Sequence, residues 1–202
     1  KGKTMATKER IVKFIKDREG GFVNDPNDRG GATNKGVTLA TYRKVCGSGK
    51  TVEDLKRISD AEWEKVFCKE FWGPLHCDLL PQGVAEVITD FAWHSGISRA
   101  VKYAQALCRT VADGCMGRGT VGALGRVEVA NFVRDYCELR RKYLLRLAGL
   151  NDQEERTLTL ARSVPSRLPL TSRAGNKRFI IGWLKRVNDL EKMCLKGDGT
   201  AG

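Results

Sequence analysis

Acidic residues, glycines and threonines are concentrated in residues 19–38, whose sequence is EGGFVNDPNDRGGATNKGVT. Glu19 follows a short amphipathic pattern, so we expect it at the end of a helix that stops before a pair of glycines. The Asx-rich turn that comes next and the Gly30-Gly31 pair let the chain reverse its direction. Asp28 and Thr33 can therefore face Glu19.

Such a group suits the cleavage of a glycosidic bond. One carboxylic acid, kept protonated by its surroundings, donates its proton to the leaving oxygen, while an ionised carboxylate activates water or stabilises the transition state. Glu19 would be the acid, Asp28 the ionised partner, and the Thr33 hydroxyl would hold the attacking water. Asp25 is a rival for the role of Asp28. An ordinary helix end followed by an Asx-rich loop has the same composition, so the spacing alone does not decide.

The elements that must position these residues are mostly helical. Apolar residues at helical spacing predict a first helix that delivers Glu19, a central core helix, a longest helix and a last helix, over residues 6–18, 82–94, 126–147 and 177–194. Residues 22–37 are expected to form a loop with a short β-like segment. Capping signals predict three further helices that begin after Thr38, Thr51 and Ser59. Thr120 can cap the helix that follows the turn at Asp113.

Four other side chains are candidates for substrate binding, besides Asp25. Trp72 lies in a stretch expected to be a loop and can stack on the apolar face of a sugar ring; the alternative is a tryptophan at the edge of the core. Asp90 is expected on the solvent- or cleft-facing side of the central helix. His94 ends that helix, with a purely structural histidine as the alternative. Asn34 follows Thr33 in the glycine-rich stretch.

Several segments together resemble one family. They are EGGF, NDPND and GGATNKGVT within residues 19–38, DFAWHSG at 90–96, the turn from Asp113 to Thr120, and GWLKRV at 182–187. In this order they resemble the N-acetylmuramidase family, also described as secretion activator proteins, a lysozyme-like group of phages and bacteria. The resemblance implies that Glu19 is the catalytic acid. The Glu19, Asp28 and Thr33 pattern is also similar to the triad of phage-type lysozymes, which favours an inverting reaction, and His94 stands where the family is expected to have asparagine.

The resemblance implies a mainly α, lysozyme-like fold with a small β-hairpin or loop lobe beside the catalytic glutamate. It also implies a peptidoglycan hydrolase that cleaves the β-1,4 bond between N-acetylmuramic acid and N-acetylglucosamine, without a metal or an organic cofactor. Two alternatives remain open: a lytic transglycosylase, which needs only one catalytic glutamate, and a non-catalytic wall-binding secretion accessory.

The composition agrees with one domain and an anionic partner. The chain has 202 residues, 41% of them hydrophobic, and a net charge of +12. Nucleic acid is the usual partner of such a basic chain, but there is no basic tail, helix-turn-helix signal or interleaved aromatic motif, so peptidoglycan glycan strands are favoured. We expect a single domain over 1–202, with a catalytic lobe at 5–120 and a helical part at 121–195. Residues 149–175 form an irregular insertion that can be a lid, a wall-binding loop or a disordered segment.

The cysteines and the apolar runs bear on where the protein works. Seven cysteines form no Cys-x-x-Cys pair, which favours free and mostly buried thiols, with Cys108–Cys115 as one possible disulfide. The two histidines give little support for a zinc site. No apolar run approaches the ~18 residues of a membrane span, and no signal-peptide core is recognisable. We expect a monomer made in the cytoplasm that acts on the cell wall after release or secretion.

Overall fold

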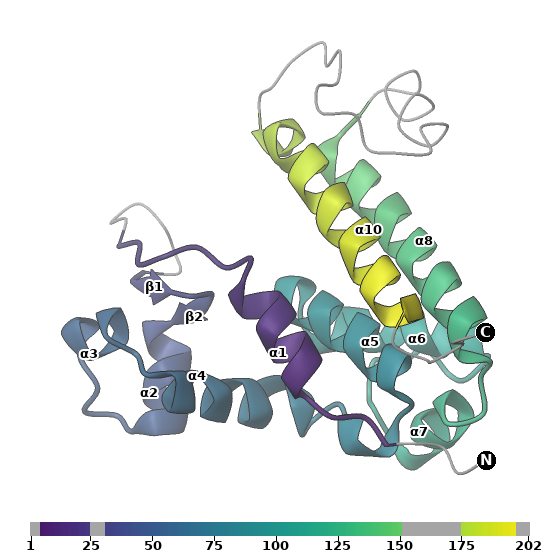
Figure 1. The fold of residues 1–202 in the computed structure, drawn as a ribbon, viewed down its shortest axis with the longest axis horizontal. Helices are drawn as coiled ribbons and strands as arrows, with labels where there is room; N and C mark the ends of the chain where they lie inside the picture. Colours follow the sequence, from purple (N-terminus) through teal and green to yellow (C-terminus); the bar gives the residue numbers. More distant parts are fainter. Residues whose placement is uncertain (1–4, 25–30, 151–174, 197–202) are drawn as a thin grey trace.

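The computed structural model describes residues 5–24, 31–150 and 175–196, and within them the chain is mainly α with one small antiparallel β-hairpin (Figure 1). This confirms the predicted fold class. The hairpin pairs β1 (Thr33–Asn34) with β2 (Val37–Thr38). The α-helices are α1 (Glu9–Lys16), α2 (Leu39–Cys46), α3 (Val52–Lys56), α4 (Asp60–Phe67), α5 (Gln82–Ser95), α6 (Ile97–Cys108), α7 (Arg118–Leu124), α8 (Val129–Ala148) and α10 (Ile180–Lys196).

Helix α5 is the centre of the core, as its apolar pattern predicts. All residues from Gly83 to Ala92 are buried, and the helix packs against α1, α6, α8 and α10. Two of its carboxylates fix neighbouring helices. Glu86 accepts hydrogen bonds from Arg10 in the first turn of α1. Asp90 pairs with Arg140 of α8 and Arg186 of α10.

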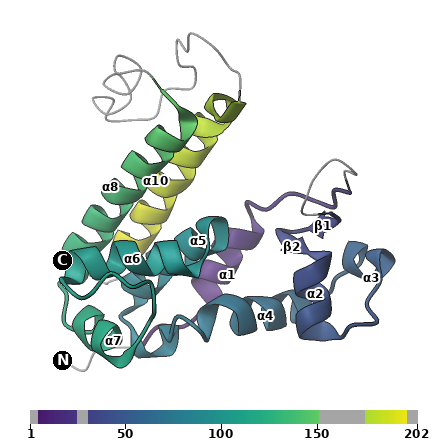
Figure 2. The same cartoon turned by 180° about the vertical axis from the view of Figure 1, so that it is seen from behind.

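Helices α8 and α10 lie side by side and extend away from the rest of the molecule, as both views show (Figures 1 and 2). Their facing apolar residues explain this pairing, since α10 buries Ile180, Leu184, Val187, Leu190 and Cys194. A short 3-10 turn (Gly175–Phe179) precedes α10, so the last helix begins three residues later than predicted. Most of the predicted 149–175 insertion lies outside the described residues.

The capping signals in the sequence correctly predict three helix starts. Thr38 accepts a hydrogen bond from the Thr41 amide at the start of α2. Thr51 with Asp54, and Ser59 with Glu62, form complete capping boxes at the starts of α3 and α4. The segment that contains the hairpin is therefore followed by short, well-defined helices.

Two local expectations differ from the structure. Helix α4 continues as a π-helical turn (Cys68–Trp72), so Trp72 is not in a loop. Thr120 lies inside α7, whose first residue follows Gly117, and it does not cap that helix. Instead the Thr120 hydroxyl accepts a hydrogen bond from Gln105, which also binds the turn at Asp113 and Gly114.

All seven cysteines are free thiols, so Cys108 and Cys115 are not joined. Cys77, Cys137 and Cys194 are buried, and Cys115 is exposed. Across 5–24, 31–150 and 175–196, no helix combines the length and the apolar character that membrane crossing requires. The same ranges contain no cluster of three or more side chains suited to holding a metal ion.

Candidate active site

Glu19 lies three residues beyond the end of α1 at Lys16, and the helix ends two residues earlier than predicted. Ile11, Phe14 and Ile15 anchor α1 in the core, and the Glu19 amide donates to the Ile15 carbonyl at 3.1 Å, which continues the last turn. The Glu19 side chain is only 14% exposed. The turn after α1 thus holds this carboxyl group at the border between the core and the solvent.

The β-hairpin covers Glu19 from one side. Lys35 and Gly36, the two turn residues, both have positive φ angles, 47° and 76°, which is the geometry of a tight two-residue hairpin turn. The Trp63 indole donates to the Lys35 carbonyl at 2.9 Å and fixes this turn. A Cβ atom at Gly36 would lie 2.7 Å from Glu19 Oε2 and 2.7 Å from the Trp93 ring. Only glycine therefore fits both the backbone conformation and the close approach.

Three side chains surround the Glu19 carboxyl group. The Trp93 indole donates to Oε1 at 3.0 Å, Arg186 Nη1 lies 3.3 Å from Oε1, and His94 Nε2 lies 3.7 Å from it. Burial raises the pKa of Glu19, whereas Arg186 and the Trp93 hydrogen bond lower it, and burial prevails. A carboxyl group whose pKa is raised in this way keeps its proton to a higher pH, as a general acid must.

Asp90 lies behind this group and is fully buried, so the expectation that it faces solvent or a cleft is wrong. Arg140 Nη1 binds Oδ2 at 2.6 Å and Arg186 Nη2 binds Oδ1 at 2.7 Å. Burial alone would raise the pKa of Asp90, but the two guanidinium groups hold it well below its usual range. Asp90 is therefore an anion that anchors Arg186, and Arg186 in turn contacts Glu19.

His94 is held by the backbone and is neutral near pH 7. Its Nδ1 lies 2.9 Å from the Asp90 carbonyl oxygen, and because a carbonyl only accepts, Nδ1 carries the proton. Burial lowers the pKa of His94 to about 4. Its Nε2 then presents a lone pair toward Glu19 and does not stabilise a negative charge there. His94 thus lies beside Glu19, and its predicted role in substrate binding stays a prediction.

Glu19, His94 and Arg186 open onto a pocket of about 360 Å³. This volume is within the usual range of small-ligand sites. Its other walls come from the end of α1 and from α10, with Arg18, Gly182, Trp183, Lys185 and Asp189. The pocket therefore joins the predicted acid to a helix more than 160 residues later in the chain.

Trp72, Asn34 and Thr33, the remaining predicted site residues that the structure describes, do not line this pocket. Trp72 is 4% exposed and its indole donates to Asp78 at 2.6 Å, so it has no free face for a sugar ring and occupies the alternative position at the core. Asn34 is also buried, and its amide donates to the Leu55 and Lys56 carbonyls, both at 2.9 Å. It closes the end of α3 and is unavailable to substrate.

Thr33 lies in the hairpin whose turn covers Glu19, and its hydroxyl is 3.3 Å from the Gly31 carbonyl oxygen. Asp25 and Asp28 lie outside the described residues. Their predicted roles therefore stay predictions from the sequence motif.

Sequence reasoning missed the roles of Arg186, Trp93 and Gly36 at this site. All three lie in segments that carry the family resemblance, so the motif marked them without indicating what they do. Arg186 could have been noticed because a cation beside the buried stripe of α10 requires an anionic partner. Its partner, Asp90, is 96 residues away, and such a distant pairing cannot be read from spacing.

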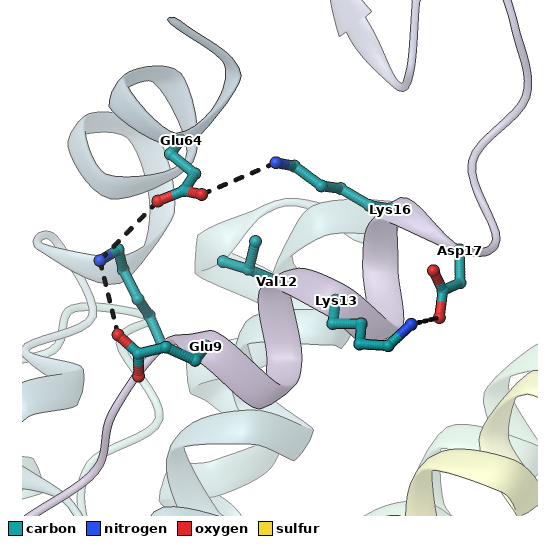
Figure 3. Close-up of a pocket in the computed structure, with 7 residues that line it drawn as sticks. Glu9, Val12, Lys13, Lys16, Asp17 and Glu64 are labelled. Atoms are coloured by element: carbon teal, nitrogen blue, oxygen red, sulfur yellow. Dashed lines mark hydrogen bonds and ion pairs between the residues drawn. The ribbon is translucent and has the colours of Figure 1, made fainter. Parts of the chain in front are cut away.

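A second pocket, of about 280 Å³, lies between α1 and α4 and has a different character (Figure 3). Lys8, Glu9, Val12, Lys13, Lys16, Asp17 and Glu64 line it. Figure 3 shows the Glu64 carboxylate pointing toward Lys16, and Lys13 toward Asp17; the ion-pair distances are 3.7 and 2.7 Å. Its acids pair with neighbouring lysines, and their side chains are 40 to 72% exposed. This pocket is not a candidate for acid catalysis.

Comparison with known proteins finds one family and one solved structure similar to this chain. Residues 12–96 match the model of the family described as glycosyl hydrolase 108. A solved structure described as "Structure of Brucella abortus SagA" is 28% identical, with a TM-score of 0.69, and the match covers 97% of this chain and 100% of that one. No curated protein matches the chain. The matched segment includes Glu19, the hairpin, Trp93 and His94, so over residues 12–96 the chain is similar to the glycosyl hydrolase 108 family.

Proposed function

We propose that this protein is a lysozyme-type N-acetylmuramidase, which hydrolyses the β-1,4 bond between N-acetylmuramic acid and N-acetylglucosamine in peptidoglycan. Glu19 is the general acid. The observation that carries the proposal is the position of the Glu19 carboxyl group, which is largely buried, has a raised pKa and opens onto a pocket. Glu19 itself lies in the segment matched by a glycosyl hydrolase family.

In this mechanism, Glu19 donates its proton to the leaving oxygen of the glycosidic bond. The Trp93 indole and Arg186 keep the carboxyl group in place and become better partners as negative charge develops on it. Asp28 activates the attacking water and Thr33 positions it, as the sequence motif indicates, with Asp25 as the rival second acid. The resemblance to phage-type lysozymes favours inversion, which a water between the two carboxyl groups permits.

The strong positive charge of the chain supports an anionic polymer as substrate. The net charge is +12, and bacterial cell walls are anionic. We propose that the protein works as a monomer on the wall after it has been released or secreted. Attraction to the wall would then raise its local concentration near the glycan strands.

Mass spectrometry of the fragments released from purified peptidoglycan tests the proposed reaction. Reducing N-acetylmuramic acid ends are expected, because water is the attacking nucleophile. Anhydro ends would overturn the hydrolytic mechanism in favour of a lytic transglycosylase. Intact strands that retain the bound protein would instead show a wall-binding accessory.

A further inference from the structure

Helix α10 has a second face besides the one that packs in the core. Gly182, Lys185, Arg186 and Asp189 follow the spacing i, i+3, i+4 and i+7, so they lie on one side of the helix. All four line the pocket that contains Glu19, and Trp183 joins them at its edge. We call these five residues the α10 wall. The side of the pocket that faces Glu19 is therefore formed mostly by a single helix, α10.

Trp183 differs from the other tryptophans of the chain. Trp63, Trp72 and Trp93 each donate the indole N–H to a protein acceptor, namely the Lys35 carbonyl, Asp78 and Glu19. The Trp183 N–H has no acceptor among the described residues, and its ring is partly exposed on the pocket. It stacks on Phe179, with ring centroids 5.9 Å apart and planes 27° apart. An oriented, half-exposed ring with a free N–H can cover the apolar face of a sugar and donate to its hydroxyl.

Gly182 leaves space beside that ring. A Cβ built at this position meets no atom within 4 Å. Glycine in a helix is destabilising relative to alanine, and no positive φ or close approach requires it here. The absence of a side chain widens the pocket next to Trp183, so a larger residue at position 182 would project into it.

Lys185 provides an unused positive charge on the same wall. The other two cations are committed, since Arg18 pairs with Asp189 at 3.2 Å and Arg186 pairs with Asp90 and Glu19. Lys185 is exposed and forms no ion pair within the described residues. Trp183 and Lys185 lie at opposite edges of the α10 wall and line the same pocket, so a ligand that lies on Trp183 can reach this cation across the wall.

We propose that the α10 wall is a saccharide subsite that binds a sugar ring on Trp183 and a carboxylate attached to that sugar on Lys185. This inference rests on the proposed function for its ligand, a glycan strand that contains N-acetylmuramic acid. The carboxylate has two possible sources there, the lactyl group of an unsubstituted muramic acid or the peptide that replaces it as an amide. In both cases the subsite selects peptidoglycan over a neutral polymer of N-acetylglucosamine.

Binding to the Glu19→Gln protein, which removes turnover, tests the subsite. Isothermal titration with three tetrasaccharides is the measurement: neutral chitotetraose, a peptide-free muramic acid tetrasaccharide, and the same with stem peptides. Trp183→Ala should weaken the affinity for all three tetrasaccharides by about tenfold, because the ring area that a sugar would cover is lost. Trp183→Phe should retain most of the affinity. Gly182→Gln should weaken all three as well, by filling the space beside the ring.

Lys185→Gln should weaken only the carboxylate ligands, by about two- to fivefold at low salt, as expected for an exposed ion pair. The muramic acid ligand whose affinity falls more in the Lys185→Gln protein identifies the source of the carboxylate. Lys192→Gln is the matched control, since it removes the same charge two turns further along α10, outside the pocket. It should leave all three affinities unchanged.

If the Trp183→Ala protein binds all three ligands as tightly as the protein that retains Trp183, and its melting temperature is unchanged, the proposed binding of a sugar ring on Trp183 is overturned. An equal loss for chitotetraose and the muramic acid ligands in Lys185→Gln would overturn the carboxylate contact. These outcomes are separate from the proposed reaction, because binding is measured without cleavage. If the parent protein cleaves peptidoglycan but the α10 wall variants bind the ligands with unchanged affinity, the proposed function stands and the subsite is overturned.

Discussion

The two pockets that border α1 contain the same kinds of side chain in different surroundings. In the pocket between α1 and α4, the Glu9 and Asp17 side chains are 72% and 52% exposed, and lysines lie close to both (Figure 3). In the pocket beside α10, the Glu19 side chain is 14% exposed. The pKa of Glu9 is lowered, chiefly by a hydrogen bond from Thr7, whereas burial raises the pKa of Glu19.

The difference shows what turns an acidic residue into a candidate catalyst. Cations accompany the carboxylates in both pockets, so charge pairing does not distinguish them. What distinguishes Glu19 is the cover provided by the hairpin turn and Trp93, which removes water from the carboxyl group. Arg186, the cation nearest to Glu19, is shared with the buried Asp90, so its charge is largely compensated elsewhere.

The largest expected difference between the two pockets is in catalysis. Glu19→Gln removes the proton donor and should reduce the rate of peptidoglycan cleavage by about 10²- to 10⁴-fold. Glu64→Gln, in the pocket between α1 and α4, should leave the rate unchanged. Turbidity loss of a wall suspension measures both. Equal rates for the parent and the Glu19→Gln protein would remove Glu19 from the mechanism.

The second largest difference is expected in the free energy of unfolding that is lost when an ion pair beside each pocket is broken. Asp90→Asn leaves Arg140 and Arg186 without their buried anion and should cost about 3–5 kcal/mol of unfolding free energy. Asp17→Asn breaks only an exposed pair with Lys13 and should cost less than about 0.5 kcal/mol. Chemical denaturation of the two variants gives the comparison. Similar losses for both would mean that the buried network does not hold the site together.

The hairpin cover itself can be tested at Gly36. Gly36→Ala places a methyl group against Glu19 and Trp93 and should cost about 1–3 kcal/mol, with a fall in the cleavage rate. Gly149→Ala is the control for backbone strain alone, because Gly149 has a φ of 64° and nothing within 4 Å of its Cβ position. Only the Gly36 variant should lose activity in a cleavage assay. Loss of activity in both would indicate a general effect on folding.

A smaller effect is expected on the pH dependence. Activity should fall as the pH rises through the pKa of Glu19, because the acid then loses its proton. Arg186 lowers that pKa, so Arg186→Met should move this alkaline limb to higher pH. Lys192→Gln removes a distant cation of the same helix and should leave the limb in place. A shift of the Arg186 variant to lower pH would contradict the assigned electrostatics.

The sequence predicts the parts of this site that depend on local patterns. The position of Glu19 shortly after α1, the three helix caps and the central helix follow from spacing and from capping residues. The expectations for Trp72, in a loop, and for Asp90, facing solvent or a cleft, are wrong for physical reasons. A π-helical turn carries the Trp72 ring into the core, and the two arginines from distant helices make it possible to bury Asp90. Neither effect leaves a signal in local spacing.

The α10 wall illustrates the same limit. The amphipathic pattern of α10 predicts its buried stripe but not which element faces its polar side. Tertiary packing alone brings residues 182–189 to the end of α1. Asp25 and Asp28 are the reverse case, since the motif indicates their roles and they lie outside the described residues.

The central claim is that Glu19 is held as a protonated acid by burial. Direct titration by NMR tests it, with ¹³C-labelled glutamate side chains and the Glu19→Gln protein to assign the resonance. The account predicts that Glu19 titrates above 4.5, the ordinary value for glutamate. A pKa at or below 4.5 would show that Arg186 and Trp93 prevail over burial, and would contradict the role of Glu19 as the general acid.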